Sequence, residues 1–455
     1  MYHDEKASQK NDFLFVFFLR EMDDRISGLV DQVAAKIGDR YTFNGKPEFF
    51  AVGSFNRCYK VDTEQSPTIF RFPIIGKSAF RYEKTNDECA VLAYISHHTS
   101  IPVPHVIKSD CFDLGPFIVM PFIEGMTLSK YLQAPSNPGE TIVLNPSIDI
   151  AILSKGYRTM ARIILELSQC RFPRIGGLRR DASKEWNIDK RALTVNMNQV
   201  VACGNFPPDQ LPQSTFSTAN EYFTSLAEAH IVHLRTQRND AVDDEADCRK
   251  KYIARCLFRN IARKFSTVHD NGPFPLYCDD FRPSNVIVDP DFSVRSAIDW
   301  EFCYAAPAEM TYCSPWWLLL AHPDDWEDGD LKSFLESYIP RQELFLRVLK
   351  DVEDMMIRNN AISDSQRLSV HMAQSLSNGS FWFCLAASSS FAFDDIYWDF
   401  IDQNHYGRFT SIEDRLALLS REEQNELEPL VQLKMQQAEE GRLDEHRTYR
   451  DLLFA

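Results

Sequence analysis

The sequence has no C-x-x-C pair, although it contains 11 cysteines in 455 residues. An odd number of scattered cysteines does not suit a disulfide framework and favours a reducing compartment. A signal-peptide pattern is also missing at the N-terminus, and the apolar run at residues 13–19 is too short to span a bilayer. We therefore expect a cytoplasmic protein with no membrane span, in which residues 13–19 pack under another element.

Two hydrolase signatures are absent. Neither G-x-S-x-G nor H-E-x-x-H occurs, so a serine hydrolase and a zinc peptidase have no support. Residues 228–233 (EAHIVH) bring together an acid and two histidines, but no third ligand pattern follows. We interpret His230 and His233 as surface or core-edge residues of a helix.

Positive charge is in deficit, with 49 Lys and Arg against 65 Asp and Glu and a net charge of −16. This argues against a nucleic-acid partner, because a phosphate backbone requires a basic face. The same field favours a small partner molecule that is neutral or cationic. The oligomeric state cannot be read from the sequence.

The first 120 residues predict a helix followed by a small sheet. Residues 11–37 have a helical pattern that should break or kink near Ser27 and Gly28, after a frayed start. Strand patterns follow at residues 49–61 (a hairpin around Gly53 and Ser54), 67–73, 106–107 and 117–120, with a helix at 82–98. We divide this part into an N-terminal helical extension, residues 1–44, and an antiparallel-sheet lobe, residues 45–120.

Residues 121–455 are predicted to be mainly helical. Residues 172–216 are rich in Pro, Gly and Asn and predict a long irregular insertion, which at this length is more often functional than not. The last 20 residues are charged and should be only partly ordered. The helices are expected at residues 150–169, 217–237, 243–269, 329–357, 366–390 and 411–438, with a capping box at Ser420 and Glu423.

The most informative stretch is residues 274–289, followed by residues 297–301. Two apolar runs flank a polar loop that carries Asp280 and Asn285, and Asp299 lies on the next strand. Phosphoryl transfer from a magnesium nucleotide needs such a set: a carboxylate receives the hydroxyl proton, and an amide oxygen and a carboxylate bind Mg²⁺. The alternative is that Asp280 and Asn285 only cap a turn, as these residue types commonly do.

With these motifs, residues 45–310 resemble the aminoglycoside phosphotransferase and choline kinase-like family. The elements occur in order: a glycine-containing turn, a strand with a basic residue, a helix with a glutamate, an Ile-Pro-Val-Pro break, a Phe-Ile-Glu-Gly hinge, D-x-x-x-x-N and Ile-Asp-Trp-Glu. The resemblance implies an α+β, two-lobed protein-kinase-like fold. The small antiparallel-sheet lobe, with one helix, would bind the nucleotide, and the large helical lobe would carry the catalytic loop and the acceptor site.

The family resemblance also implies site residues. Asp280 would be the catalytic base, and Asn285 and Asp299 the metal ligands. The turn and the hinge would contact the nucleotide, and Arg71 would bind its phosphates with Glu88 as partner. The implied nucleotide-binding residues are Gly53, Ser54, Phe55, Asn56, Arg71, Glu88, Met120 and Phe122.

Some alternatives stay open at this point. Asp279 competes with Asp280 for the role of base, although the spacing to Asn285 selects Asp280. Glu83 is the alternative partner of Arg71, which would otherwise face solvent. Cys278 stands where the family usually has histidine, and a cysteine at the end of an apolar strand is more often buried and inert than nucleophilic.

We therefore expect an enzyme that uses ATP or GTP with Mg²⁺ to phosphorylate a hydroxyl group of a small acceptor. The alternative is a pseudokinase, an inactive nucleotide- or ligand-binding module. It is motivated by Arg71 in place of the usual lysine, by Cys278, and by the single glycine in the turn. A kinase acting on proteins is disfavoured, because Pro307 follows Glu301 too closely to leave an activation segment.

Overall fold

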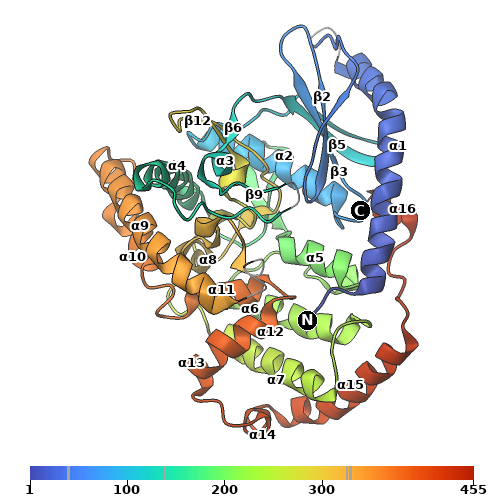
Figure 1. The fold of residues 1–455 in the computed structure, drawn as a ribbon, viewed down its shortest axis with the longest axis vertical. Coiled ribbons are helices and arrows are strands. Elements are labelled where there is room, and N and C mark those ends of the chain that lie inside the picture. Colours follow the sequence, from blue (N-terminus) through green and yellow to red (C-terminus); the bar gives the residue numbers. More distant parts are fainter. Residues whose placement is uncertain (38–40, 138–139, 324–325, 327–329, 455) are drawn as a thin grey trace.

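An antiparallel sheet lies in the N-terminal part of the protein (Figure 1). The structure, a computed structural model, describes residues 1–37, 41–137, 140–323, 326 and 330–454. The sheet has five strands in the order β1-β2-β3-β5-β4. The strands are β1 (Glu48–Val52), β2 (Asn56–Val61), β3 (Thr68–Pro73), β4 (Lys108–Phe112) and β5 (Gly115–Pro121). The predicted hairpin and the strands at 67–73 and 117–120 are confirmed, whereas the strand placed at 106–107 begins at Lys108.

Two helices cover opposite faces of this sheet. The alternation of side chains along each strand determines which residues face each helix. Along β3, Phe70 and Phe72 belong to the apolar cluster that includes α1 (Glu5–Ile37). Ile69 and Arg71 point the other way, because successive side chains of a strand alternate between faces. That second face is covered by α2 (Arg81–His98), which confirms the helix predicted there. Arg71 is therefore placed under a helix.

The long N-terminal helix α1 is continuous, so the break expected near Ser27 and Gly28 is wrong. A Cβ atom added at Gly28 would meet nothing within 4 Å, which shows that this glycine lies on an open side of the helix. The frayed start is also wrong, because Asp4 is buried and accepts hydrogen bonds from Asn239. Among the described residues, none of the helices combines the length and the hydropathy needed to cross a bilayer.

The rest of the chain is a helical body with short strands. One sheet has the order β13-β10-β7, another β12-β11-β6, and β8 and β9 form a hairpin. These strands are β6 (Met126–Thr127), β7 (Arg171–Phe172), β8 (Gly177–Arg180), β9 (Trp186–Lys190), β10 (Phe274–Cys278), β11 (Val286–Val288), β12 (Val294–Ala297) and β13 (Cys303–Ala305). The helices are α3 (Leu128–Leu132), α4 (Ile150–Gln169), α5 (Val195–Cys203), α6 (Ala219–Thr236), α7 (Glu245–Ala262), α8 (Ala308–Tyr312), α9 (Leu331–Arg358), α10 (Ser369–Met372), α11 (Ser380–Ser388), α12 (Phe393–Ile396), α13 (Asp402–Tyr406), α14 (Ile412–Leu416), α15 (Arg421–Glu440) and α16 (Tyr449–Phe454).

Several predicted helices differ in extent. The helix expected at 366–390 is divided into α10 and α11 by Gly379, whose φ is +79°. The one expected at 411–438 is divided into α14 and α15, and the predicted capping box at Ser420 and Glu423 starts α15. Residue 329, where α9 was expected to begin, lies outside the described residues. The C-terminal segment includes α16, where the carbonyl of Leu453 accepts a hydrogen bond from the buried Arg81 at 3.1 Å.

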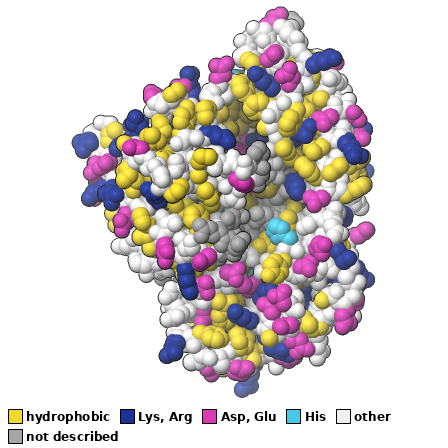
Figure 2. Space-filling model, viewed as in Figure 1, with side chains coloured by type: hydrophobic (Ala, Val, Ile, Leu, Met, Phe, Trp, Pro, Cys, Tyr) yellow, Lys and Arg dark blue, Asp and Glu magenta, His cyan; other side chains and the backbone are white. Residues whose placement is uncertain are grey.

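The predicted insertion at residues 172–216 is not irregular. It contains the β8–β9 hairpin and α5, and ion pairs join it to α2. Lys190 pairs with Asp87, and the Nε of Arg191 donates to Glu83 at 2.8 Å. Composition alone suggested a loop, but these contacts across the chain hold the segment against the helix of the small lobe. On the face shown in Figure 2, lysines and arginines are interspersed with acids and do not form one basic field.

The two histidines of α6 are fully buried, so their predicted place at the surface or core edge is wrong. Ser390 lies 2.8 Å from Nδ1 of His230, and Gln237 lies 2.8 Å from Nε2 of His233. Burial lowers the pKa of His230 to about 3 and that of His233 well below its ordinary value. Both side chains therefore stay neutral in the folded protein at mildly acidic pH.

This burial predicts acid sensitivity. Below pH 6.5, His230 and His233 bind protons in the unfolded chain but not in the folded protein. The free energy of unfolding therefore falls as the pH falls. Between pH 7 and pH 5, each histidine should lower the free energy of unfolding by about 2 kcal/mol. Urea unfolding at both pH values measures this, and His230→Gln should reduce the difference. The exposed His97→Gln is the control, and an unchanged pH dependence in His230→Gln would contradict the explanation.

Candidate active site

The loop after β10 places Asp280 and Asn285 together. The loop ends in a turn of 3₁₀-helix, Pro283–Asn285, and the Nδ2 of Asn285 donates to the backbone carbonyl of Asp280 at 2.8 Å. The carbonyl of Asn285 accepts from the N–H of Ile298 at 2.8 Å, which ties the loop to the segment carrying Asp299. The amide oxygen of Asn285 has no hydrogen-bond partner among the described residues. Asn285 thus closes the loop with its N–H group and keeps its oxygen for another ligand.

The carboxyl group of Asp280 has a raised pKa. Burial, opposed by Arg282 and assisted by nearby Asp299 and Glu301, raises its pKa to about 7. The Nε of Arg282 lies 3.2 Å from Oδ1 of Asp280. A cation bound by Asn285 and Asp299 would lower this pKa again, because a local positive charge favours the carboxylate.

Asp279 is held in a different way. Its Oδ2 accepts from the N–H of Val195 at 3.0 Å and its Oδ1 accepts from the hydroxyl of Tyr304 at 3.1 Å. Burial raises its pKa to about 7. One carboxyl oxygen therefore holds the start of α5 and the other is held by Tyr304 of β13, and this geometry disfavours Asp279 as the base.

Cys278 ends β10 opposite Cys303 in the strand ladder. Its Sγ lies 3.4 Å from the backbone carbonyl of Glu301. The contact with Cys303 and burial raise the pKa of the Cys278 thiol well above its ordinary value. The side chain is therefore a neutral, buried thiol, as expected for a structural cysteine.

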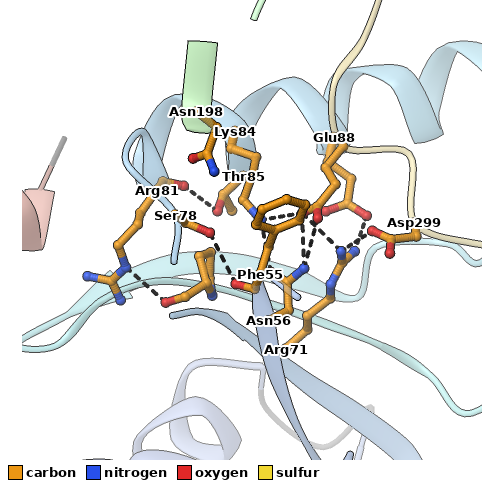
Figure 3. A network of polar contacts seen from close by, with 12 residues as sticks. Phe55, Asn56, Arg71, Ser78, Arg81, Lys84, Thr85, Glu88, Asn198 and Asp299 are labelled. Atoms are coloured by element: carbon orange, nitrogen blue, oxygen red, sulfur yellow. Dashed lines mark hydrogen bonds and ion pairs between the residues drawn. The ribbon is translucent and has the colours of Figure 1, made fainter. Parts of the chain in front are cut away.

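Arg71 points into a cluster of carboxylates under α2 (Figure 3). It forms ion pairs with Glu88 and with Asp299, and its Nη2 lies 3.1 Å from Glu301. The predicted Arg71–Glu88 pair is confirmed, and a solvent-facing Arg71 is wrong because its side chain is 9% exposed. Glu83, the alternative partner, pairs with Arg191.

Asp299 has a left-handed backbone, with φ of +64°, which an aspartate tolerates better than most residues. This conformation turns the chain between β12 and β13. The ion pair with Arg71 joins the predicted phosphate-gripping residue directly to a predicted metal ligand. Burial raises the pKa of the Asp299 carboxyl, and Arg71 opposes that shift.

A second buried cation, Lys84, was missed by the sequence reasoning. Its Nζ forms an ion pair with Glu301 and donates to Oδ1 of Asn56 at 3.0 Å. Asn56 in turn donates to both carboxylate oxygens of Glu301, at 3.2 and 3.0 Å. The side-chain amide of Asn56 is therefore turned into this cluster, and its predicted contact with a nucleotide, which used backbone groups of the turn, stays a prediction. The available signal was the i, i+4 spacing of Lys84 and Glu88, which places both on one face of a helix.

The cluster has an excess of negative charge. Three carboxylates, those of Glu88, Asp299 and Glu301, face the two cations Arg71 and Lys84. Burial raises the pKa of Glu88 to about 7, with Arg71 opposing, whereas Lys84 and Arg71 together overcome burial and lower the pKa of Glu301. An uncompensated buried carboxylate is costly, so the third acid of the cluster is neutralised either by a proton, as the raised pKa values of Glu88 and Asp299 indicate, or by a further cation beside Asp299.

The residues of the turn that are predicted to contact the nucleotide differ in their accessibility. The turn at Gly53 is tight, because its N–H donates to the carbonyl of Asn56 at 2.8 Å, and Ser54 is exposed. Phe55 packs edge-on against Phe302, with ring centroids 5.3 Å apart. Gly53 and Ser54 therefore remain the accessible part of the turn.

In the predicted hinge, one backbone group of Phe122 is bonded within the protein. Its backbone N–H donates to the carbonyl of Pro67 at 2.8 Å, so this group is already engaged. Met120 is buried in β5 and pairs with Ile69 across the ladder. The ring of Phe122 lies against that of Phe50, with centroids 5.4 Å apart. The predicted contacts of Met120 and Phe122 with a nucleotide stay predictions.

A cavity of about 360 Å³ adjoins the loop. It extends from Ser54 and Phe55 past Asp280 into the helical lobe. Its walls include Leu276, Tyr277, Met310, Thr311, Cys313, Trp316, Trp317, Met372, Phe381, Cys384 and Leu385. The carboxyl group of Asp280 therefore lies between the glycine turn of the small lobe and the part of the cavity in the large lobe.

The sheet lobe carries a buried pair of a basic and an acidic residue, and the acids on the loops of the helical lobe face that pair. This is the arrangement of the protein-kinase-like phosphotransferases. The protein has this α+β fold. The sequence agrees: the model of the phosphotransferase enzyme family matches residues 47–343, and the chain belongs to that family.

Solved structures that match this chain include the following three. The aminoglycoside phosphotransferase APH(4)-Ia is 14% identical, with a TM-score of 0.42 over 81% of this chain and 97% of that chain. A putative fructosamine-3-kinase from Haemophilus somnus is 10% identical, with a TM-score of 0.36 over 92% and 99% of the two chains. Spectinomycin phosphotransferase APH(9)-Ia, in complex with ADP and spectinomycin, is 11% identical, with a TM-score of 0.36 over 93% and 97%. No curated protein matches the sequence.

Proposed function

We propose that the protein transfers the γ-phosphoryl group of ATP or GTP, with Mg²⁺, to a hydroxyl group of a small acceptor. The observation that carries this proposal is the place of Asp280, which lines the cavity and belongs to the same loop as Asn285. The eleven cysteines are free thiols, which supports the further proposal that the enzyme works in the reducing cytoplasm.

The residues present fit a magnesium ion. The amide oxygen of Asn285 has no hydrogen-bond partner in the part of the chain that the structure describes, and Asp299 has a partly exposed carboxyl group in a cluster with more acidic than basic side chains. Within the described residues no group of three His, Cys, Asp or Glu side chains is placed to bind a metal alone. Mg²⁺ does not require one, since it usually binds one or two carboxylates together with phosphates and water. When bound, Mg²⁺ neutralises charge on the transferring phosphoryl group.

The chain's own groups divide the remaining work. Asp280 orients the acceptor hydroxyl and takes its proton late in the transfer, because the transition state is loose. Gly53 and Ser54 lie over the phosphates, where backbone N–H groups and the serine hydroxyl are donors. Arg71, held by Glu88, would provide a guanidinium group for the phosphates, and Asp299, its other partner, would hold the metal together with Asn285.

Nucleotide binding provides the test of this proposal. ATP or GTP with Mg²⁺ at 100 times its Kd should raise the free energy of unfolding by about 2.7 kcal/mol, measured as a rise in melting temperature. Asp299→Asn should weaken the Mg²⁺ dependence of that rise, because it removes a charged ligand. If neither nucleotide changes the melting temperature of the wild-type protein, the proposed function is wrong. Binding without transfer to any acceptor would instead identify the inactive module considered above.

A further inference from the structure

Helix α2 presents two pairs of charged side chains to different parts of the protein. Lys84 and Glu88 point into the buried cluster, where Glu88 holds Arg71 (Figure 3). Glu83 and Asp87 each lie one position earlier in the chain, so they project from the adjoining face, about 100° around the helix axis. The large lobe binds this adjoining face.

Two consecutive basic residues at the end of β9 form these contacts. Lys190 pairs with Asp87, and Arg191 binds Glu83 with two nitrogens, its Nε donating at 2.8 Å and its Nη2 at 2.5 Å. The guanidinium group of Arg191 also lies over the ring of Phe80, 4.6 Å from the ring centroid, where α2 begins. Hydrogen bonds between charged groups with two parallel contacts fix a geometry and do not only add free energy. These contacts therefore set the orientation of α2.

The strand that carries the two basic residues is anchored in the large lobe. Gly176, which precedes β8, exchanges backbone hydrogen bonds of 3.1 and 2.9 Å with Ala305 of β13. The N–H of Gly177 donates to the carbonyl of Arg191 at 3.2 Å. Because β13 also pairs with β10, which leads into the loop of Asp280, α2 is held by the same strands that support this loop.

A further contact from the large lobe holds the backbone just before α2. The Oδ1 of Asn198, in α5, accepts from the N–H of Ala79 at 2.7 Å, and its Nδ2 donates to the carbonyl of Lys77 at 2.9 Å. The hydroxyl of Ser78, between these two residues, donates to the carbonyl of Phe55 in the glycine turn at 3.1 Å (Figure 3). The large lobe thus holds the start of α2 and, through Ser78, the glycine turn.

We propose that Lys190 and Arg191 are positioning residues of the nucleotide site: they hold α2 against the large lobe, so that Glu88 keeps Arg71 in place before the nucleotide binds. This inference rests on the proposed function and assigns a role to the insertion at residues 172–216. When only a fraction of the molecules has the binding conformation, the apparent affinity falls by that fraction. Loss of the two contacts should therefore weaken nucleotide binding although every phosphate-binding group is still present.

The test measures binding of ATP or GTP with Mg²⁺ to the full chain by calorimetry. The double variant Lys190→Met, Arg191→Met should bind the nucleotide about tenfold more weakly than the wild type, as for a competent fraction reduced to a tenth. Lys190→Met alone breaks one pair and should weaken binding less. Lys190→Arg keeps the positive charge and should bind like the wild type. Wild-type affinity in the double variant, or in Lys190→Met where the double variant does not fold, would overturn the inference.

Arg259→Met is the matched control. Its side chain is 17% exposed and pairs with Glu228 at 2.9 Å and with Glu423 at 2.6 Å, which lie in helices of the large lobe. This variant should also lose stability, because it breaks ion pairs of similar burial, but it should keep the nucleotide affinity of the wild type. Equal weakening of nucleotide binding in Arg259→Met and in the double variant would contradict a specific role of Lys190 and Arg191.

Hydrogen exchange of the α2 amides separates this inference from the proposed function, because it needs no nucleotide. In the double variant these amides should exchange about tenfold faster than in the wild type, and in Arg259→Met they should exchange at the wild-type rate. If the wild type binds no nucleotide and α2 exchanges faster only in the double variant, the proposed function is wrong and the hold on α2 stands. If the wild type binds the nucleotide and α2 exchanges equally in all three proteins, the hold on α2 is wrong and the function stands.

Discussion

Asp280→Asn should lower the rate of phosphoryl transfer by about 10²–10⁴-fold, the usual contribution of a positioned general base. Asparagine keeps the shape of the side chain but cannot accept the hydroxyl proton. The backbone carbonyl of Asp280, which accepts from Asn285, remains in place, so the loop should keep its conformation. Single-turnover transfer with γ-labelled nucleotide measures the loss, and the nucleotide-induced rise in melting temperature should be largely retained.

Asp279→Asn is the matched control for that experiment. Asparagine has one amide oxygen in place of two carboxyl oxygens. It can therefore keep the hydrogen bond from Val195 or the one from Tyr304, but not both. We expect a loss of stability of about 1–3 kcal/mol from the broken contact and a much smaller loss of transfer rate. A larger loss of transfer in Asp279→Asn than in Asp280→Asn would reverse the assignment of the base. Unfolding of Asp280→Asn would instead support the turn-capping interpretation.

The second large effect concerns stability. Lys84→Met should destabilise the protein by about 3–5 kcal/mol, because removing one partner of a buried ion pair leaves the other charge uncompensated. Lys84 is 2% exposed at its side chain, and Glu301 is 1% exposed. Without the lysine, three carboxylates would face Arg71 alone. Equilibrium urea unfolding measures the change.

Lys36→Met is the control for Lys84→Met. Lys36 forms an ion pair with Asp110 at 2.7 Å, but its side chain is 55% exposed. Exposed pairs of this kind contribute about 0–1 kcal/mol, so the control should change stability little. A Lys84→Met variant as stable as Lys36→Met would show that the buried cluster does not depend on the lysine.

The local patterns of the sequence predicted the hairpin, two further strands and the helix of the small lobe. Period-two alternation along β3 separates Arg71 from Phe70 and Phe72, and a glutamate on the following helix then becomes its expected partner. The order of strand, loop and strand around Asp280 similarly predicts β10 and β11 on either side of the loop. These features depend on neighbours in the chain, which a sequence pattern records directly.

Features that depend on distant contacts were not predictable in the same way. Asn56 lies next to the glycine turn, but its amide is drawn inward by Lys84 and Glu301, and Glu301 is 245 residues away. The insertion gains its order from ion pairs with α2, and no local pattern in the chain records those pairs. The unbroken α1 follows from burial along the sheet, which outweighs the helix-weakening preference of Gly28.

The most direct test of the central claim is transfer of label from γ-labelled ATP or GTP to a panel of small hydroxyl-bearing acceptors, with and without Mg²⁺, in wild-type protein and Asp280→Asn. We predict a labelled acceptor only in the wild-type reaction that contains Mg²⁺. Equal labelling by Asp280→Asn, or labelling that persists after the metal is chelated, would contradict the assignment of Asp280 as base and of Asn285 and Asp299 as metal ligands.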